Sequence, residues 1–473
     1  MSLTMATELW RMSAIELAEA IRTRQVSSHE VIDAHLRRIE AVNSSINAVV
    51  MVLTEQALKV AEAADLAVAA GADLPPLHGV PFTVKENIDV AGTPTTQGFK
   101  ALASAYPLRD APMVERLKTA GAIPIGRTNL PSGAIRWHYE SELWGATVNP
   151  WDKSRTPGAS SAGEAAAIAT GMSPLGLGND GLGSLRHPAQ CCGVSALKPT
   201  LGRIPHATTV EPADIATIGM QITQVNGPLA RRVADLREAF EMVAGPIWRD
   251  PWTVPAPLRG PELVKPIQVA IVLDPAGQGT AQQVQDGVRK AADALVQEGY
   301  PVDEVEPPGI DVAAKALVVM LSTPGIRAVW QRVMPPSLPA ATRRFMSAFF
   351  EAAGDPDAVA AEESFITRQS VLRLWSEFQE HHPLIVAPIA TDIPRKAGTD
   401  LDDGAVANDL RAMRMAMAVN TLGLPAVALP VGTRDGLPQA VQVIGPRYRE
   451  DLILEAAAAI EDRVGIITPI DPR

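Results

Sequence analysis

Apolar residues recur at helical spacing through the first 70 residues of the chain. The periodic stretches cover residues 15–21, 31–39 and 53–70. Apolar residues three and four positions apart form one face of a helix, so this pattern predicts three amphipathic helices. Ser13 precedes the first stretch and is a residue type that caps helix N-termini. We therefore expect a helical prologue over residues 1–70, with its first helix beginning near Ser13.

From Gly79 onward the pattern changes to short apolar runs that alternate with helical stretches. Runs of strand length occupy residues 80–84, 122–125, 175–177, 267–273, 384–387, 426–430 and 441–445. Helical stretches occupy residues 113–120, 162–171, 281–299, 405–422 and 451–462. Such alternation is typical of α/β proteins, in which helices cover a sheet. The pattern predicts a central mixed β-sheet with helices on both faces.

Two further regions bear on the domain organisation. Residues 246–266 are rich in proline and tryptophan and lack periodicity, which indicates a surface connection between two halves. Residues 311–383 are mainly helical and hold many of the methionine and phenylalanine residues. A chain of 473 residues exceeds the usual size of one compact domain, but α/β enzymes of this length often share one core. We expect a single large domain, residues 1–473.

The composition narrows the possible partners and location. The formal net charge of -11 repels phosphates, and no local block of lysine and arginine offsets it, so nucleic acid is not an expected partner. The N-terminal segment lacks the features of a signal peptide, and the apolar runs are too short to cross a bilayer. The two cysteines, Cys191 and Cys192, are adjacent and offer no disulfide framework. A cytoplasmic protein without membrane contact is expected.

Two serine sites bracketed by glycine are the strongest chemical signal. The first is Gly-Ala-Ser-Ser-Ala-Gly at residues 158–163, and the second is Gly-Asn-Asp-Gly-Leu-Gly-Ser at residues 178–184. A serine hydroxyl becomes a good nucleophile only when a neighbouring base removes its proton, and no histidine is placed to serve either site. Lys85 ends an apolar run, and a desolvated lysine can be neutral near pH 7. The pattern favours a serine hydrolase with a lysine base.

The glycines of the two loops have a structural as well as a chemical interpretation. Small residues such as Gly163 and Ala165 let a helix approach a sheet closely, and this alone would explain the first loop. It does not explain residues 181–184. Glycines next to a serine give consecutive backbone N–H groups the freedom to converge on one point, as an oxyanion hole requires.

Other motifs match known patterns only formally. Residues 176–181 match the dinucleotide-binding fingerprint, but Pro188 argues against the long helix that would hold a pyrophosphate. Residues 195–198 match the acyl-serine motif of penicillin-binding proteins, whose companion motifs are missing. His29 and His35 are too far apart to share a metal on one helix face, and we expect both at the surface. We expect no metal and no cofactor, and we assign no histidine a role.

Taken together, the motifs resemble those of the amidase signature family. Members carry a lysine in a Gly-Val-Pro-containing strand, a Gly-Gly-Ser-Ser-Gly-Gly loop, a Gly-Gly-Ser nucleophile followed by an apolar residue and arginine, and Cys-Gly-x-x-x-Leu-Lys-Pro-Thr. This chain has the corresponding segments in the same order: GVPFTVKEN at 79–87, GASSAG at 158–163, GLGSLR at 181–186 and CGVSALKPTLGRIP at 192–205. The resemblance extends from the N-terminal helices to residues 423–445.

The resemblance implies one site built from both serine loops and the lysine. In such a site Ser184 is the nucleophile, Ser160 is a bridging serine behind a cis peptide bond, and Lys85 is the base that takes the proton through Ser160. The backbone N–H groups of four residues would form the oxyanion hole, with three more residues in support. These are Gly181, Leu182, Gly183 and Ser184 for the oxyanion hole, and Ser161, Asp180 and Arg186 for support.

The chain departs from the family pattern at three positions that are usually glycine, namely Ala159, Ala162 and Leu182. These differences leave open whether the loops keep their usual shape. A catalytically inactive binding protein on the same fold is a further alternative. All the side chains that would handle protons are present, so we expect an active enzyme.

The first functional expectation is a stand-alone hydrolase of small aryl or alkyl amides that forms an acyl-enzyme on Ser184. Carbamates (urethanes) and esters pass through a similar tetrahedral oxyanion and are natural further substrates. We expect an apolar pocket with walls from residues 132–135 and 317–350, so that the helical segment 311–383 would line it. The protein would act as a monomer or homodimer on a small molecule. The alternative is a subunit of a glutamine-dependent amidotransferase, which works in a multi-chain complex on charged tRNA.

Overall fold

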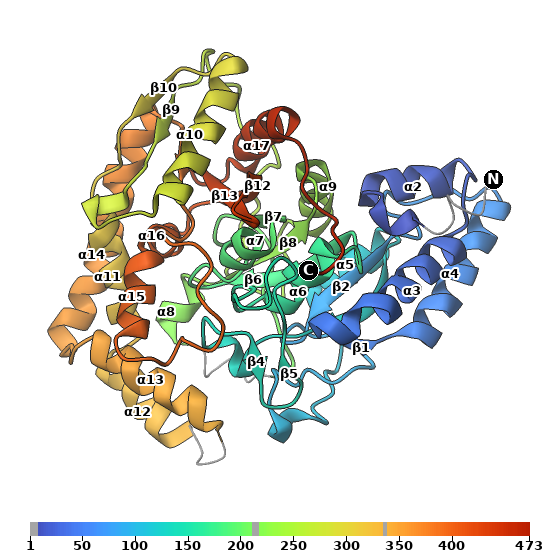
Figure 1. Ribbon diagram of the computed structural model, residues 1–473, viewed down its shortest axis with the longest axis horizontal. Helices are drawn as coiled ribbons and strands as arrows, with labels where there is room; N and C mark the ends of the chain where they lie inside the picture. The colour runs from blue at the N-terminus through green and yellow to red at the C-terminus, as the bar shows by residue number, and fades with distance from the viewer. Residues whose placement is uncertain (1–7, 211–216, 334–337) are drawn as a thin grey trace.

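Figure 1 shows the computed structural model of the chain, which describes residues 8–210, 217–333 and 338–473. An eleven-stranded sheet crosses the molecule, and helices cover both of its faces. The predicted α/β class, one large domain around a central mixed sheet, is confirmed. Residues 1–7 of the expected prologue and residues 334–337 of the expected pocket wall lie outside the described ranges.

The sheet is mixed, and strands distant in sequence are neighbours in it. In spatial order its strands are β1 (Val49–Val52), β3 (Ile123–Thr128), β2 (Pro81–Lys85), β6 (Leu175–Asp180), β8 (Val225–Ala230), β7 (Ser195–Lys198), β12 (Ala426–Arg434), β13 (Leu437–Ile444), β11 (Leu384–Ala387), β9 (Val269–Ile271) and β10 (Val302–Glu304). Strand β2 pairs in parallel with β3 and β6, and β9 pairs in parallel with β10 and β11. The remaining pairs are antiparallel.

The helices form two layers, one on each face of the sheet. They are α2 (Ala14–Arg22), α3 (Ser28–Ile46), α4 (Thr54–Ala69), α5 (Pro112–Thr119), α6 (Ala162–Ala169), α7 (Arg186–Cys192), α8 (Ile218–Gln221), α9 (Val233–Val243), α10 (Gln282–Gln297), α11 (Ile310–Met320), α12 (Pro324–Val333), α13 (Ala340–Ala352), α14 (Ala358–His381), α15 (Ala405–Ala412), α16 (Arg414–Leu422) and α17 (Glu450–Val464). Val427 of β12 belongs to the same buried cluster as residues of α9, α10 and α17, whereas the next residue, Ala428, belongs to the cluster that includes residues of α6 and α7. Successive side chains of a strand point to opposite faces, so both layers share one sheet.

The three predicted N-terminal helices are present, and the first begins directly after Ser13 as predicted. Ser13 caps α2 and Ser27 caps α3, each in a reciprocal capping box with the glutamate three residues later. A short strand, β1, lies between α3 and α4 and was not predicted, because its four residues sit between two strongly helical patterns. The expected helical prologue is otherwise confirmed over the described residues.

Two central strands escape prediction for a local reason. Strand β8 contains Asn226, Gly227 and Pro228, a combination typical of turns, yet it pairs with β6 along its whole length. Strand β7 consists of residues 195–198, which match a serine–lysine motif and for which the sequence analysis predicts no strand. The predicted helix over residues 405–422 is interrupted at Met413, where the chain separates α15 from α16.

The expectation that both His29 and His35 lie at the surface is wrong for His35. His29 is exposed, but His35 is fully buried on α3, and its Nδ1 lies 2.8 Å from the carbonyl oxygen of Val31. Burial lowers the pKa of His35 to about 4, which keeps the ring neutral. The two free cysteines, Cys191 and Cys192, are both buried.

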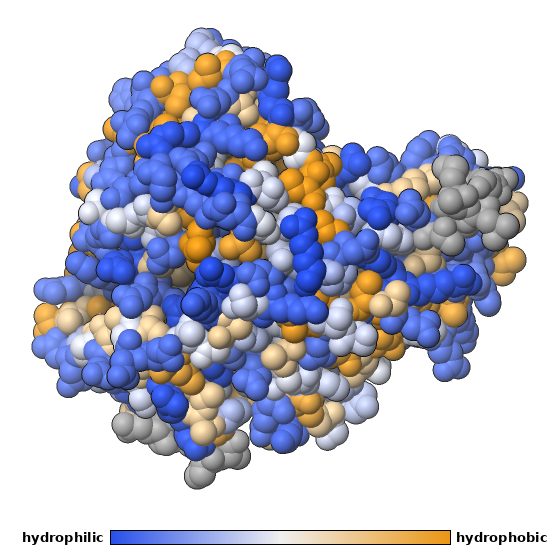
Figure 2. All heavy atoms as spheres, in the orientation of Figure 1, coloured by the Kyte–Doolittle hydropathy of each residue, from blue (hydrophilic) through white to orange (hydrophobic). Residues whose placement is uncertain are grey.

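Polar residues cover most of the face seen in Figure 2, where hydrophobic residues appear in small separate groups. Within the described ranges, no single helix has the length and apolar character needed to cross a membrane. Helices α11 and α12 meet these criteria only when taken together, and they are bent by 45° at their break.

Candidate active site

The sheet brings Lys85 and the two serine loops to one edge. Lys85 is the last residue of β2, and β2 runs parallel to β6, which leads directly into residues 181–184, here called the Ser184 loop. The carboxyl ends of parallel strands meet at the same edge, so the lysine and this loop become neighbours. Residues 158–161 lead into α6 and form the third part of the site.

Lys85 is fully buried and bonded to the first serine loop. Its Nζ donates to Ser160 Oγ at 2.7 Å and to Asn179 Oδ1 at 2.7 Å. Burial lowers the pKa of Lys85 from 10.5 to about 7, against the opposing charges of Asp180 and Glu164. A lysine in this state is neutral in a large fraction of molecules near pH 7 and can accept a proton.

Asn179 was not identified from the sequence. It lies at the end of β6, and its Nδ2 donates to Asn87 Oδ1 at 3.0 Å, while its own Oδ1 accepts from Lys85. This second contact fixes which end of the amide faces the lysine. The only signal in the sequence is its place between the strand and the glycines of the Ser184 loop.

Glu164 was also missed, and it is the second buried acid near Lys85. It lies in the first turn of α6, and its two carboxylate oxygens accept from the hydroxyls of Thr83 and Thr128. Thr83 precedes Lys85 by two positions on β2, and Thr128 is the partner of Lys85 on β3. Burial raises the pKa of Glu164 to about 7, despite the two hydroxyls and the lysine.

The first serine loop has alanine at position 159 and a cis peptide bond directly after it. The peptide bond between Ala159 and Ser160 is cis, as the resemblance implies. Gly158 has a φ of 78°, and a Cβ there would lie 2.7 Å from Pro188 Cα, so this position requires glycine. A Cβ on Gly163 would lie 2.4 Å from the backbone nitrogen of Asn129, which confirms the close packing expected of the small residues. Ala159 is fully buried without such a conflict.

The two serine loops are joined through the backbone. The amide of Ser161 donates to the carbonyl oxygen of Ser184 at 3.2 Å, which places Ser160 beside the second loop. Ser184 is half-buried, and its hydroxyl has no hydrogen bond to any residue that the structure describes. The Ser161 hydroxyl is buried and likewise without a partner in the described ranges.

Asp180 and Arg186 hold the Ser184 loop as the resemblance implies. Asp180 accepts from the amides of Gly183 at 2.7 Å and Leu185 at 3.1 Å, and from Arg186 Nε at 3.0 Å. Burial alone would raise the pKa of Asp180, but the guanidinium of Arg186 lowers it well below its usual range. Both side chains are fully buried. Asp180 therefore stays ionised, and its hydrogen bonds hold the Ser184 loop in place.

Arg186 also ties the loop to the C-terminal half of the chain. Its guanidinium donates to Gln442 Oε1 of β13 at 2.8 Å and to Asn420 Oδ1 of α16 at 2.6 Å. Asn420 Nδ2 in turn donates to Asp180 Oδ1 at 3.0 Å. Segments more than 200 residues apart thus fix the position of Ser184.

Of the four amides expected to form the oxyanion hole, one has another partner. The Gly183 amide donates to Asp180. The amides of Gly181, Leu182 and Ser184 donate to no acceptor among the residues that the structure describes. These three amides have no acceptor there that would compete with a ligand.

The two other formal motifs do not have the structures that their patterns require. Residues 176–181 form β6 and its exit, and the following α7 is short and contains Pro188, as expected for a segment without a nucleotide. Ser195 and Lys198 lie on β7, where Lys198 Nζ donates to the carbonyl oxygen of Leu424 at 2.6 Å. Ser195 Oγ makes no hydrogen bond in the described structure, so the pair is no acyl-serine motif.

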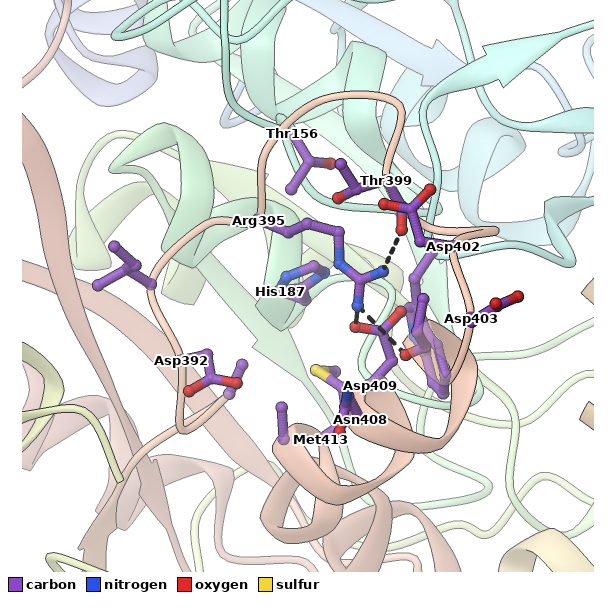
Figure 3. Close-up of a pocket in the computed structure, with 15 residues that line it drawn as sticks. Thr156, His187, Asp392, Arg395, Thr399, Asp402, Asp403, Asn408, Asp409 and Met413 are labelled. Carbon is purple, nitrogen blue, oxygen red and sulfur yellow. Dashed lines mark hydrogen bonds and ion pairs between the residues drawn. The ribbon is translucent and has the colours of Figure 1, made fainter. Parts of the chain in front are cut away.

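A cavity of about 340 Å³ lies beside the Ser184 loop (Figure 3). It is lined by Trp137, Thr156, His187, Ala390, Asp392, Ile393, Arg395, Thr399, Asp402, Asp403, Ala405, Asn408, Asp409, Ala412 and Met413. Its wall is rich in charged residues and does not include the expected segments 132–135 and 317–350. The helical segment approaches the site instead through Phe345, which packs edge-on against Trp137 with ring centroids 6.2 Å apart.

Comparison with known proteins identifies the family of this chain. The family model described as Amidase matches residues 30–454. Indoleacetamide hydrolase of Bradyrhizobium diazoefficiens is 40% identical, with 97% of this chain and 88% of that protein covered. A glutamyl-tRNA(Gln) amidotransferase chain of Moorella thermoacetica is 32% identical, with 96% of this chain and 97% of the relative covered.

Solved structures agree with the sequence relatives. The structure of 6-aminohexanoate cyclic dimer hydrolase in complex with substrate superposes with a TM-score of 0.83 at 27% identity, covering 98% of this chain and 99% of that one. A bacterial aryl acylamidase of the amidase signature enzymes has a TM-score of 0.82 at 24% identity, covering 95% and 96%, and shows the same fold. The chain therefore belongs to the amidase signature family and is a hydrolase that acts on amides.

Proposed function

We propose that the chain hydrolyses small aryl or alkyl amides through an acyl-enzyme on Ser184, with Ser160 and Lys85 as its proton relay. The observation that carries the proposal is the buried Lys85 amine, bonded at 2.7 Å to Ser160 Oγ and with its pKa lowered to about 7. A base must be unprotonated near the working pH and within hydrogen-bond reach of its partner. Lys85 meets both conditions.

The proposed proton path runs from Ser184 through Ser160 to Lys85. Ser184 Oγ gives its proton to Ser160 Oγ as it attacks the amide carbonyl, while Ser160 passes its own proton to Lys85 Nζ. Reversal of the path protonates the leaving amine, after which water attacks the acyl-enzyme by the same route. The amide of Ser161, bonded to the Ser184 carbonyl oxygen, supports this path because it keeps the two serines adjacent.

The proposed oxyanion hole uses the amides of Gly181, Leu182 and Ser184. They flank the Gly183 amide, whose bond to Asp180 supports the proposal because it fixes the loop before substrate arrives. Donors that need no reorganisation stabilise a developing oxyanion by about 3–4 kcal/mol each in serine hydrolases. Carbamates and esters develop the same oxyanion, so we include them as further substrates.

The proposal includes the pH dependence of the reaction and the part that Glu164 plays in it. The value of kcat/KM should rise with pH through about 7, because protonated Lys85 has no lone pair for Ser160. Negative charge on Glu164 favours the protonated lysine. Glu164→Gln removes that charge, so the midpoint of the rise should move to lower pH by about one unit. The measurement is kcat/KM against pH for both proteins.

Glu461 supplies a matched control for this prediction. Its pKa is also raised to about 7, chiefly by burial, but its carboxylate lies on α17 and accepts from the amide of Val233. Glu461→Gln should leave the midpoint where it is in the unchanged protein. If the midpoint in Glu164→Gln equals that of the unchanged protein, or moves toward higher pH, an electrostatic effect of Glu164 on Lys85 is contradicted.

The second candidate is a component of an amidotransferase complex, and the similarity to the Moorella thermoacetica protein favours it. The two proposals differ in what the isolated chain can do. A stand-alone amidase should hydrolyse an anilide with no partner chain and no glutamine present. The measurement is release of the aromatic amine by the purified chain, with Ser184→Ala as background. Activity that appears only with glutamine and added partner chains would favour the amidotransferase.

A further inference from the structure

The cavity beside the Ser184 loop is in direct contact with it. Trp137 Nε1 donates to the carbonyl oxygen of Leu182 at 3.3 Å, and the backbone amide of His187 donates to the Gly183 carbonyl oxygen at 2.7 Å. Met413 closes the same corner, because its Cε lies so near Gly183 that a Cβ there would collide with it. A group held in this cavity would therefore lie next to the Ser184 loop.

The cavity wall carries an excess of negative charge. Four aspartates line it, against a single arginine, Arg395. The guanidinium of Arg395 is already engaged by Asp409 and by the carbonyl oxygens of Thr399 at 3.3 Å and Ala405 at 3.5 Å. The other three aspartates form no ion pair with residues in the described ranges. These are Asp392, Asp402 and Asp403. The field of such a wall attracts cations.

Two buried hydrogen-bond acceptors in the wall have no partner within the described part of the chain. They are Asp409 Oδ2 and His187 Nδ1. Burial lowers the pKa of His187 to about 4, so at neutral pH the ring is neutral and one of its two nitrogens is a hydrogen-bond acceptor. Figure 3 shows Arg395, His187 and Asp409 converging at the centre of the cavity. Buried acceptors are normally satisfied, so these two indicate a ligand with several donors.

We propose that this cavity binds an ammonium group of the substrate, so that the enzyme prefers amides carrying a primary amine away from the scissile bond. The inference rests on the proposed function, because it takes the Ser184 loop as the reacting centre. An ammonium offers three N–H donors and one positive charge, which match two bare acceptors in an acidic wall. A carboxylate would be repelled, and an alkyl end would leave both acceptors unpaired. The amine can belong to the acyl part or to the leaving group, since the recognised chemistry is the same.

The test compares matched substrates at pH 8. One arm uses ω-aminoacyl p-nitroanilides of increasing chain length and the unsubstituted acyl p-nitroanilides of equal length. The other arm uses acetyl amides of ω-diamines and of the corresponding monoamines. In at least one arm the ammonium substrate should have a kcat/KM about 10-fold higher than its neutral partner, as expected for a charge-assisted contact. A ratio of one or less for every pair in both arms would overturn the inference.

Substitutions of the cavity aspartates test whether the preference for ammonium substrates arises in this cavity. Asp409→Asn should reduce the ratio of kcat/KM between the ammonium and the neutral substrate to nearly one. A loss of activity that affects both substrates equally leaves this ratio unchanged. A double variant at exposed positions, Asp402→Asn with Asp403→Asn, should also reduce it and leaves both members of the Arg395–Asp409 ion pair in place. Asp286→Asn is the control, because Asp286 lies on α10 and pairs with Arg434, away from the cavity. An unchanged ratio in both cavity variants would refute the assignment.

The assay also separates this inference from the proposed function. If the unchanged chain turns over no substrate of either kind above the level of Ser184→Ala, the proposed function fails and the inference fails with it. If neutral amides are hydrolysed and the ammonium preference is absent, the proposed function stands and only the inference is overturned.

Discussion

Replacement of Ser184 by alanine is expected to lower kcat/KM for a small amide by at least about 10⁴-fold, since loss of the nucleophile in a serine hydrolase removes nearly all of its chemical advantage. The fold should be unaffected. The Ser184 hydroxyl has no hydrogen bond to the described residues, and the contact that joins the loops uses the Ser184 carbonyl oxygen instead. The measurement is turnover of an anilide together with the melting temperature.

Ser195→Ala is the matched control for Ser184→Ala. Ser195 is a buried serine on strand β7, and its hydroxyl also makes no hydrogen bond in the described structure. Its replacement should leave both turnover and melting temperature close to those of the unchanged protein. Full turnover by Ser184→Ala would remove Ser184 from the mechanism, whereas loss of turnover by Ser195→Ala would show that the assay reports on folding.

Replacement of Lys85 by methionine is expected to have the second-largest effect, a loss of about 10³-fold in kcat/KM, within the range typical of a general base. Methionine fills a similar volume but cannot accept a proton from Ser160. The residual activity should no longer rise with pH near 7, because the group that titrates there is absent. The measurement is kcat/KM from about pH 5 to pH 9 for both proteins.

Lys198 allows a comparison between two buried lysines. Burial lowers its pKa to about 7 as well, but it donates to the carbonyl oxygens of Pro199 and Leu424 and not to a serine. Lys198→Met should lower the melting temperature, because those buried carbonyl oxygens lose their donor. The pH midpoint of its remaining activity should stay near 7. A pH rise that persists in Lys85→Met would exclude Lys85 as the titrating base.

The course of the chain was predictable wherever its pattern was strong. Strand β11 and helices α2 and α17 lie where the periodicity places them, because burial on one face imposes that periodicity on the sequence. Strand β8 was not predictable, since Asn226, Gly227 and Pro228 have turn propensities that the neighbouring strands override. His35 was misplaced because a buried ring can satisfy its nitrogen with a backbone carbonyl that no sequence pattern reveals.

The candidate site shows the same division. Lys85, Ser160 and Ser184 were identified because each lies in a short sequence motif that indicates its chemistry. Their surroundings were not, since Glu164 and Asn179 acquire importance only when β2, β6 and α6 meet. The expected apolar pocket depended on residues 132–135 and 317–350, whereas the cavity beside the Ser184 loop is walled largely by residues 390–413 and is acidic.

The sequence by itself determined the alternation of helices and strands wherever the pattern was strong, the α/β class and the lysine and serines of the proposed relay, because each depends on local pattern or on a motif of adjacent residues. Only the tertiary structure decided that Arg186 connects Asp180 to Asn420 and Gln442, that the Gly183 amide is bonded to Asp180, and that the neighbouring cavity is acidic. The physical reason is common to all three. Burial, hydrogen-bond pairing and summed charge depend on which distant segments become neighbours, and no local stretch of the chain contains that information.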